Sequence, residues 1–446
     1  MGGHDRRQDV RLTRPPATRR PDARGPDPLG TAARRAALRL LDAVLRRGEP
    51  LESALALATR ALPGGPDRGL AHAIAAETLR RLPDLDALID GATRQRLPDD
   101  AKARFVLRIA LAQALGLGTP PHAAIATVLP LVDGGPKRLV HGVFGTLMRG
   151  NAALPAVPTL PEEVAERWEA SWGADMVDGA ARAIASPPPL DLTLRDAGET
   201  AAWAERLGGV SLAPGHVRLR EAAPVSELPG FAEGAWWVQD LAASIPARLL
   251  AGASGTAIDL CAAPGGKCMQ LAAQGKSVTA VDISATRLER VRENLARTGL
   301  AAEVVTADAL DWAPATPVDA VLVDAPCSAT GIMRRHPDVL YRAHAGIIAE
   351  MADLQARIFA RALDWVRPGG TLVYATCSLE PEEGEAQLAA LLATRGDYTV
   401  DPVGAGELPD GIAPAADGSV RTFPGTLADA GGCDGFFVAR LRRASL

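Results

Sequence analysis

The second half of the chain alternates short apolar runs with helical stretches, and this rhythm limits the possible fold more than any other feature. Each run has the length and composition of a buried strand. Because helical segments separate most of the runs, the pattern indicates a doubly wound, largely parallel sheet in an α/β domain. The predicted strands are Ala257–Leu260, Val278–Val281, Glu303–Thr306, Ala320–Val323 and Thr371–Tyr374.

The part of the chain before residue 150 has the apolar spacing of helices and no predicted strand. In Ala33–Arg47, for example, Leu38, Leu41 and Leu45 are apolar and arginines lie between them. We expect five to seven helices in residues 29–150, packed as an all-α bundle. The other predicted helices are Leu70–Arg81, Leu85–Ala92, Phe105–Leu115, Ile125–Val132 and Leu139–Met148, with a break at Pro120-Pro121.

Prolines divide the middle of the chain. Residues 151–186 are predicted to be a linker that contains a helical segment at Glu162–Ile184. Residues 187–236 are predicted to be a small α+β module, and residues 237–446 the α/β domain. The elements expected in the small module are strands at Leu190–Thr193 and Val217–Leu219 and a helix at Thr200–Leu207.

The charge of the chain limits how it can meet nucleic acid. The formal net charge is −5 at pH 7, so any contact with RNA must come from local basic patches. Residues 1–28 hold seven arginines and four aspartates, a net charge of +3. We expect a disordered basic arm there, which either touches RNA or is a solvated tail.

Cysteine usage and hydropathy indicate a cytoplasmic protein. Five cysteines, an odd number, with no CxxC pair, argue against a disulfide framework and against a metal site. The sequence has no apolar stretch of about 18 residues and no apolar core of a secretory signal near its start. We therefore expect no membrane association and no metal.

Residues 259–267, DLCAAPGGK, follow the first predicted strand of the α/β domain and precede a helix. Small residues let a backbone approach a ligand closely, and a helix start offers free N–H groups. Neither the Walker phosphate loop nor the GxGxxG pattern is present. The string is either a ligand-binding turn or a purely structural one.

Acidic residues follow the next two strands. Asp282 follows Val278–Val281 directly, and Asp308 lies just beyond Glu303–Thr306. At the carboxyl edge of a parallel sheet, Asp282 could accept hydrogen bonds from the ribose hydroxyls of an adenosine, and Asp308 could reach the adenine. The alternative is that each caps a helix.

Two cysteines also follow predicted strands, in DAPCS (residues 324–328) and ATCS (residues 375–378). A thiolate that adds to C6 of cytosine makes C5 nucleophilic, and the reaction also needs a group at N3 and a proton acceptor for C5. Asp324, Cys327 and Cys377 supply these types, although spacing does not decide which cysteine attacks. The polar segment Arg334–Asp338 either grips phosphates near a flipped base or is a solvated loop.

These strings resemble the motifs of the RNA 5-methylcytosine methyltransferases of the Sun (Fmu) type. The family has a multidomain fold that ends in a Rossmann-like methyltransferase domain. The helical front end resembles a NusB-like RNA-binding domain. The matching segments are Val238-Gln239-Asp240, DLCAAPGGK, DAPCS, RRHPD at Arg334–Asp338, ATCS, and DGFF at Asp434–Phe437.

The resemblance implies a role for each site residue. It makes Cys377 the nucleophile that bonds to cytosine, has Cys327 assist product release, and places Asp324 near both the methyl donor and the cytosine. The cofactor implied is S-adenosyl-L-methionine. The residues implied to bind it are Cys261, Ala262, Ala263, Pro264, Gly265, Gly266, Lys267, Asp282, Asp308 and Asp324.

The resemblance also implies a substrate, small-subunit (16S) ribosomal RNA, either free or partly assembled because a packed base cannot be flipped out. We expect the protein to act as a monomer. Two alternatives are the same chemistry on tRNA or another RNA, and a non-catalytic RNA-binding factor in ribosome assembly.

Overall fold

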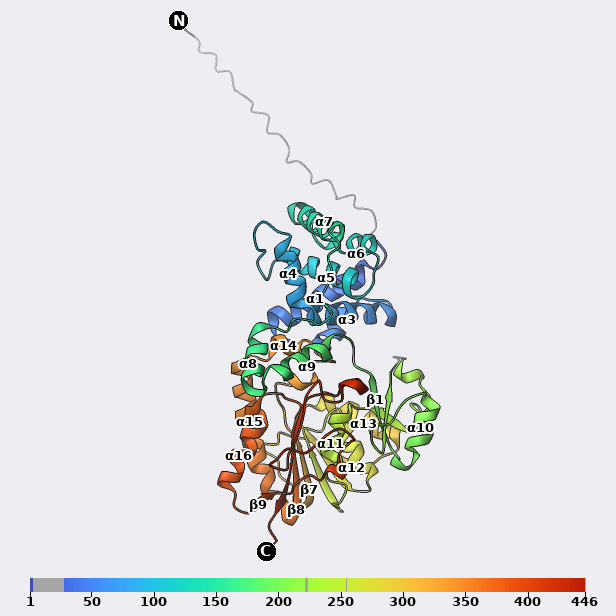
Figure 1. Ribbon diagram of the computed structural model, residues 1–446, viewed down its shortest axis with the longest axis vertical. Helices are drawn as coiled ribbons and strands as arrows, with labels where there is room; N and C mark the ends of the chain where they lie inside the picture. The colour runs from blue at the N-terminus through green and yellow to red at the C-terminus, as the bar shows by residue number, and fades with distance from the viewer. Residues whose placement is uncertain (3–27, 221–223, 254, 446) are drawn as a thin grey trace.

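The front of the chain folds into a helical bundle, shown at the top of Figure 1. The computed structural model describes residues 1–2, 28–220, 224–253 and 255–445, so the predicted basic arm lies almost entirely outside the described residues. Between residues 28 and 150 the structure describes seven α-helices. They are α1 (Thr31–Arg47), α2 (Leu51–Thr59), α3 (Gly65–Arg80), α4 (Leu82–Gly91), α5 (Lys102–Leu111), α6 (Pro121–Val128) and α7 (Gly134–Arg149).

The core of this bundle confirms the predicted all-α architecture. Leu40 and Leu41 of α1, Ile74 of α3, and Val106 and Ile109 of α5 are fully buried together. Helix α6 begins at Pro121, before the predicted Ile125, because proline fits the first position of a helix, where its missing N–H costs nothing. Helix α2 was not predicted.

Two further helices follow, α8 (Glu162–Trp172) and α9 (Ala174–Ile184), where one helical segment was predicted. The break is Gly173, whose φ of 84° is open to glycine and strained for other residues. Both helices lie between the bundle and the α/β domain (Figure 1). The indole N–H groups of Trp168 and Trp172 donate to Glu380 Oε1 and to the Leu379 carbonyl.

The small α+β module is a three-stranded antiparallel sheet with one helix. Strand β1 (Leu190–Leu194) lies between β2 (His216–Leu219) and β3 (Trp236–Val238). The helix is α10 (Thr200–Leu207). Because β3 leads directly into α11 (Leu241–Arg248), the small sheet is joined closely to the α/β domain.

The α/β domain is built on one sheet with the strand order β10-β11-β8-β7-β4-β5-β6, and β9 pairs with β11. Strands β4 to β8 run parallel, and β11 is antiparallel to β8. The strands are β4 (Thr256–Leu260), β5 (Ser277–Asp282), β6 (Glu303–Thr306), β7 (Val318–Asp324), β8 (Val366–Thr376), β9 (Tyr398–Val400), β10 (Val420–Thr422) and β11 (Phe436–Arg443).

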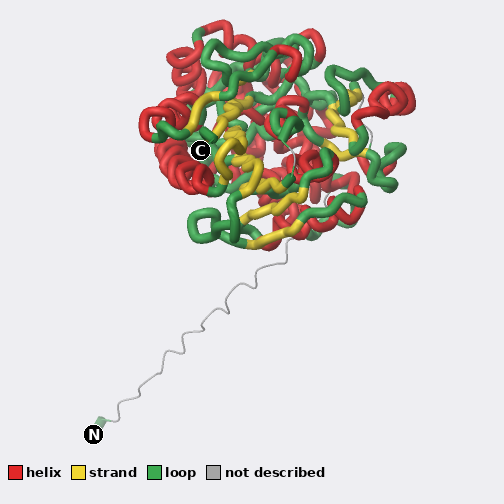
Figure 2. Tube along the Cα trace, turned by 90° about the horizontal axis from the view of Figure 1, so that it is seen from below, coloured by secondary structure: helices red, strands yellow, loops and turns green. Residues whose placement is uncertain are grey.

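Helices cover both faces of this sheet, as the view from below in Figure 2 shows. On β7, Ala320 and Leu322 pack toward one face, whereas Val321 and Val323 pack toward the other. This strict alternation confirms the doubly wound, Rossmann-like fold. The first face is covered by α11, α12 (Gly266–Ala273) and α13 (Ala285–Thr298), and the second by α15 (Ala345–Asp364) and α16 (Glu385–Thr394).

A short helix, α14 (Val339–Arg342), joins the α/β domain to the helical bundle. The Tyr341 hydroxyl donates to the Leu79 carbonyl at 2.7 Å, and the Arg342 guanidinium donates to the Gly48 carbonyl. Asp338 accepts the backbone N–H of Leu51 at the start of α2. In the described part of the chain, none of the helices has the length and apolar character needed to cross a membrane.

Candidate active site

The turn after β4 is shaped by two unusual backbone positions. Cys261 has φ of 58° and Gly265 has φ of 105°. A Cβ atom at Gly265 would also make a tight contact of 3.3 Å with a methyl group of Val291 on α13, but the positive φ is the main reason for glycine there. The turn brings the N-terminal end of α12 to the carboxyl edge of the sheet.

A cavity of about 460 Å³ lies at this edge. Its aromatic wall comes from Phe231, Trp237 and Phe436, which lie in or beside the small sheet and β11. The predicted site residues that line it are Ala262, Ala263, Pro264, Gly266, Lys267, Asp324 and Cys377. The structure thus brings the turn, the DAPCS aspartate and the ATCS cysteine to one cavity.

Two sulfur atoms lie side by side at the end of the cavity. Strands β7 and β8 are neighbours, with Asp324 opposite Ala375, so the loops that follow them start together. Cys327 Sγ and Cys377 Sγ are 3.4 Å apart. The hydrogen bond to Cys377, together with burial, raises the pKa of Cys327 well above its ordinary value. Cys377 is the one of the two that lines the cavity.

Lys267 supplies a buried positive charge beside the sulfur pair. Its Nζ donates to Asp324 Oδ2 at 2.7 Å. Burial disfavours the ammonium, but Asp324 and Cys377 outweigh it and raise the pKa of Lys267 above its usual value. The lysine therefore remains charged and can stabilise a thiolate on Cys377.

The two strand-end acids are bound to nearby backbone. Asp282 accepts the N–H groups of Ala263, at 3.2 Å, and Ser284, at 2.9 Å. Asp308 accepts the N–H of Leu310 at 2.8 Å. Asp282 therefore fixes the turn after β4 through Ala263. Contact of either acid with an adenosine stays a prediction, as does cofactor contact for Cys261 and Gly265, which do not line the cavity.

Asp259 is a fully buried carboxyl group near the end of β4, close to Asp324 and Lys267. Both of its oxygens lack a hydrogen-bond partner within the described residues. Burial, with the nearby Asp324 charge, raises the pKa of Asp259 to about 8. The neutral form of this carboxyl group therefore predominates at pH 7, beside the charges of Lys267 and Asp324.

The segment Arg334–Asp338 is not a solvated loop at its start, since Arg334 is 1% exposed. Arg335 and His336 line the cavity, and a contact of this segment with phosphate stays a prediction. Arg335 donates to Asp240 at 2.9 Å, and Arg334 lies within 4.0 Å of the carboxylates of Asp240 and Asp434. These buried ion pairs join RRHPD to the VQD and DGFF strings. The sequence does not predict these ion pairs, because the arginines and their aspartate partners lie far apart along the chain.

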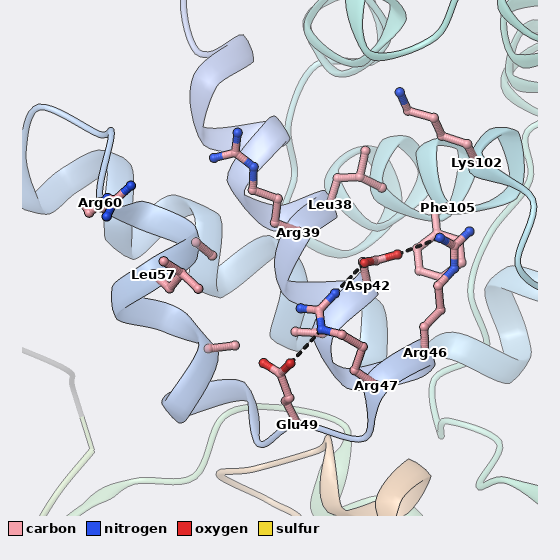
Figure 3. Close-up of a pocket in the computed structure, with 13 residues that line it drawn as sticks. Leu38, Arg39, Asp42, Arg46, Arg47, Glu49, Leu57, Arg60, Lys102 and Phe105 are labelled. Carbon is pink, nitrogen blue, oxygen red and sulfur yellow. Dashed lines mark hydrogen bonds and ion pairs between the residues drawn. The ribbon is translucent and has the colours of Figure 1, made fainter.

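A second cavity, of about 550 Å³, lies in the helical bundle between α1, α2 and α5 (Figure 3). Leu38, Leu57 and Phe105 contribute apolar surface. Two acids, Asp42 and Glu49, are paired with Arg46 and Arg47. In the described structure Arg39, Arg60 and Lys102 also line this cavity, and they make no ion pair there.

Fold and site together define a class: a helical bundle followed by a Rossmann-like methyltransferase domain with a two-cysteine centre. Family models agree, since "16S rRNA methyltransferase RsmB/F" matches residues 248–442 and "NusB family" matches residues 31–138. The ribosomal RNA small subunit methyltransferase B of Xanthomonas campestris is 39% identical over 446 residues, covering 93% of this chain and 98% of the relative. The chain belongs to the RsmB/F methyltransferase family, which confirms the resemblance seen in its motifs.

A further relative and two solved structures agree with this family assignment and with the fold. The Klebsiella pneumoniae small subunit methyltransferase B is 35% identical, covering 91% of this chain and 96% of that protein. The crystal structure of PH0851 has a TM-score of 0.70 at 22% identity, over 93% of this chain and 99% of its own. NSun6 from Pyrococcus horikoshii gives 0.54 at 19% identity, over 64% of this chain and 99% of its own. These two structures support the fold.

Proposed function

We propose that the protein transfers a methyl group from S-adenosylmethionine to C5 of a cytosine in small-subunit rRNA. The observation that carries the proposal is the pair of thiols, 3.4 Å apart, at the end of a cavity that also holds Lys267 and Asp324. A cysteine that only fills space in the core needs neither a second thiol nor a charged lysine next to it. Two thiols next to such a cavity suit a reaction in which one attacks and the other moves a proton.

The residues of the cavity fit S-adenosylmethionine. The small side chains of Ala262 and Ala263, and the lack of a side chain at Gly266, leave room for a ligand along this wall of the cavity. Asp324 carries a negative charge that suits a sulfonium or an ammonium group. When bound, the cofactor supplies an electrophilic methyl group.

Cys377 is the nucleophile in this mechanism. Lys267 stabilises its thiolate, and Cys377 Sγ bonds to C6 of the cytosine. As the C5–C6 double-bond electrons shift toward N3, Asp324 passes to N3 the proton that Lys267 holds against it. N3 returns this proton when C5 takes the methyl group.

Cys327 completes the reaction. Once Cys377 is bonded to carbon, it no longer bears a charge or shares a hydrogen with Cys327. The Cys327 thiol can then release its proton to water, and its thiolate takes the C5 proton. The electrons of that C–H bond reform the C5–C6 double bond, and the bond from C6 to Cys377 breaks with its electron pair returning to sulfur.

Small-subunit rRNA is the proposed substrate because the relatives named above carry it in their names. It also suits a helical bundle with an arginine-lined cavity, which would give the local basic patch that a chain of net charge −5 needs. Activity on rRNA would place the protein in the cytoplasm.

The test is methyl transfer from labelled S-adenosylmethionine to undermethylated small-subunit rRNA, with tRNA as the competing substrate. We expect incorporation into rRNA as 5-methylcytosine, and none with Cys377→Ala. Cys327→Ala should instead accumulate a protein–RNA adduct visible on a denaturing gel. Unchanged incorporation by Cys377→Ala would refute the assignment.

A further inference from the structure

We propose that Glu383 is a positioning residue: its carboxylate holds the Cys327 and Cys377 loops in register and keeps the proton of the thiol pair on Cys327. The effect on the thiols is independent of any substrate. The effect on turnover rests on the proposed function. Glu383 lies outside every motif that the sequence singles out.

Glu383 accepts hydrogen bonds from the residue next to each cysteine. Ser328, which follows Cys327, donates its backbone N–H at 2.8 Å and its hydroxyl at 2.5 Å. Ser378, which follows Cys377, donates its hydroxyl to the same carboxylate oxygen that accepts the Ser328 hydroxyl. The two serine Oγ atoms are 3.2 Å apart. One carboxylate thus joins the loops whose sulfur atoms are 3.4 Å apart.

The carboxylate is itself held firmly. Glu383 is fully buried, and its carbonyl accepts the Tyr374 hydroxyl at 2.8 Å. Gln355 of α15 donates to Glu383 Oε1 at 3.2 Å and to the Pro326 carbonyl at 2.8 Å, so it ties the carboxylate to the loop ahead of Cys327. Each carboxylate oxygen lies within hydrogen-bonding distance of two donor groups, and the bonds from Ser328 and Ser378 favour the ionised form against the burial that raises the pKa of Glu383.

The charges around the two thiols are therefore asymmetric. Cys377 lies near the Lys267 ammonium, whereas Cys327 lies near the Glu383 carboxylate. The hydrogen bond to Cys377, burial and the charge of Glu383 all raise the pKa of Cys327. The proton that the pair shares therefore stays on Cys327. The other titratable or charged groups facing this cluster are Asp324, Tyr374, Glu380 and Arg421.

The experiment measures the alkylation of each cysteine by iodoacetamide across pH, in the full-length protein without RNA or cofactor, with the sites resolved by peptide mass spectrometry. Wild-type protein should react first at Cys377. Glu383→Gln keeps the shape and removes the charge, so Cys327 should react roughly tenfold faster near pH 8, the equivalent of about one pKa unit. Ser378→Ala keeps the charge of Glu383 but removes its hydrogen bond to the loop that carries Cys377. This variant should slow the alkylation of Cys377 instead.

Glu380→Gln is the matched control. Glu380 is also fully buried in the same segment, but its side chain is held by Arg167 and Trp168. Because the charge of Glu380 is paired with Arg167, this variant should lose thermal stability and change the alkylation ratio of the two cysteines much less than Glu383→Gln does. A Glu383→Gln protein with the wild-type ratio and wild-type pH profiles would overturn the proposal.

Turnover gives a second readout. With rRNA, Glu383→Gln should lower kcat with little change in KM, because the shared proton then spends more time on Cys377 and less of the nucleophile is ionised. If wild-type protein transfers no methyl group, the proposed function fails while the alkylation result still stands. A lower kcat with an unchanged alkylation ratio would reduce Glu383 to a structural role and overturn the proposal.

Discussion

Lys267 Nζ lies 2.7 Å from Asp324 Oδ2, and this contact joins the start of α12 to the end of β7 across the floor of the cavity. The lysine comes from the cofactor turn and the aspartate from the DAPCS string. The ion pair is buried on the lysine side, where an unpaired charge would be costly. It therefore links the two halves of the proposed chemistry, methyl donor and nucleophile.

The ion pair predicts the effect of removing its positive charge. Lys267→Met should lower kcat for methyl transfer by roughly 10²-fold, because the Cys377 thiolate loses its stabilising charge. The rate should also begin to rise at a higher pH than in wild-type protein. The control is Lys276→Met, which removes a lysine whose Nζ donates to the Ala253 carbonyl at the opposite end of the sheet. Equal losses in both variants would contradict the prediction.

Asp259 predicts a dependence of stability on pH. Its pKa is about 8 in the folded protein and 3.8 ordinarily, so between these values the folded state holds a proton that the unfolded state has lost. The contribution of Asp259 to the free energy of unfolding is complete below about pH 4 and declines as the pH rises through about 8. Relative to wild type, Asp259→Asn should gain a few kcal/mol across this range in urea unfolding. A difference that does not vary with pH would refute this.

Tyr341 predicts how firmly the bundle is joined to the α/β domain. Tyr341→Phe loses the hydrogen bond to the Leu79 carbonyl and should cost about 1 kcal/mol. It should also speed proteolysis in residues 150–190. Tyr398→Phe, which loses a bond to the Leu363 carbonyl inside the α/β domain, should cost a similar amount without that increase. Equal proteolysis of both variants would show that α14 does not hold the domains together.

The cavity in the helical bundle predicts an RNA contact. Reversing Arg39 and Arg60 to glutamate should weaken rRNA binding by about 1 kcal/mol per residue and flatten its salt dependence. The control pair is Arg357→Glu and Arg367→Glu, two exposed arginines of the α/β domain. If both pairs weaken binding equally, the effect comes from net charge and not from this cavity.

The five predicted strands correspond to β4 to β8, because each contains a short apolar run. That run is buried on both faces in β4, β5, β7 and β8 and half-buried in β6 at the edge of the sheet. The error lies at β8, which begins at Val366 and not at Thr371. Pro368 and Gly369 indicate a turn, but the register of β8 against β7 shifts between Val318 and Ala320, and the irregularity lets the strand continue. Whether a strand can continue through a proline and a glycine depends on how it pairs with the neighbouring strand. The local sequence gives no information about that pairing.

The residues of the site also separate into those that a local sequence pattern predicts and those that depend on distant partners. The sequence predicts that Cys327, Cys377 and Asp324 lie close together, because each lies at or just beyond the end of a strand and parallel strands bring their ends together. Glu383 and Arg334 could not be assigned, since a charged residue in a polar stretch looks solvated until its buried partners are known. Glu383 reaches Ser328, and Arg334 reaches Asp434, through contacts that only the folded chain creates. The serines after both cysteines were the one local hint.

Helices α8 and α9 pack at the back of the loop that carries Cys377. The indoles of Trp168 and Trp172 bind Glu380 and Leu379, within three residues of the sulfur. A truncated protein that starts at residue 187 would thus lose a supporting wall and not merely a spacer. The methyltransferase domain is therefore not structurally independent of α8. A fusion protein that contains this domain would need to include both tryptophans.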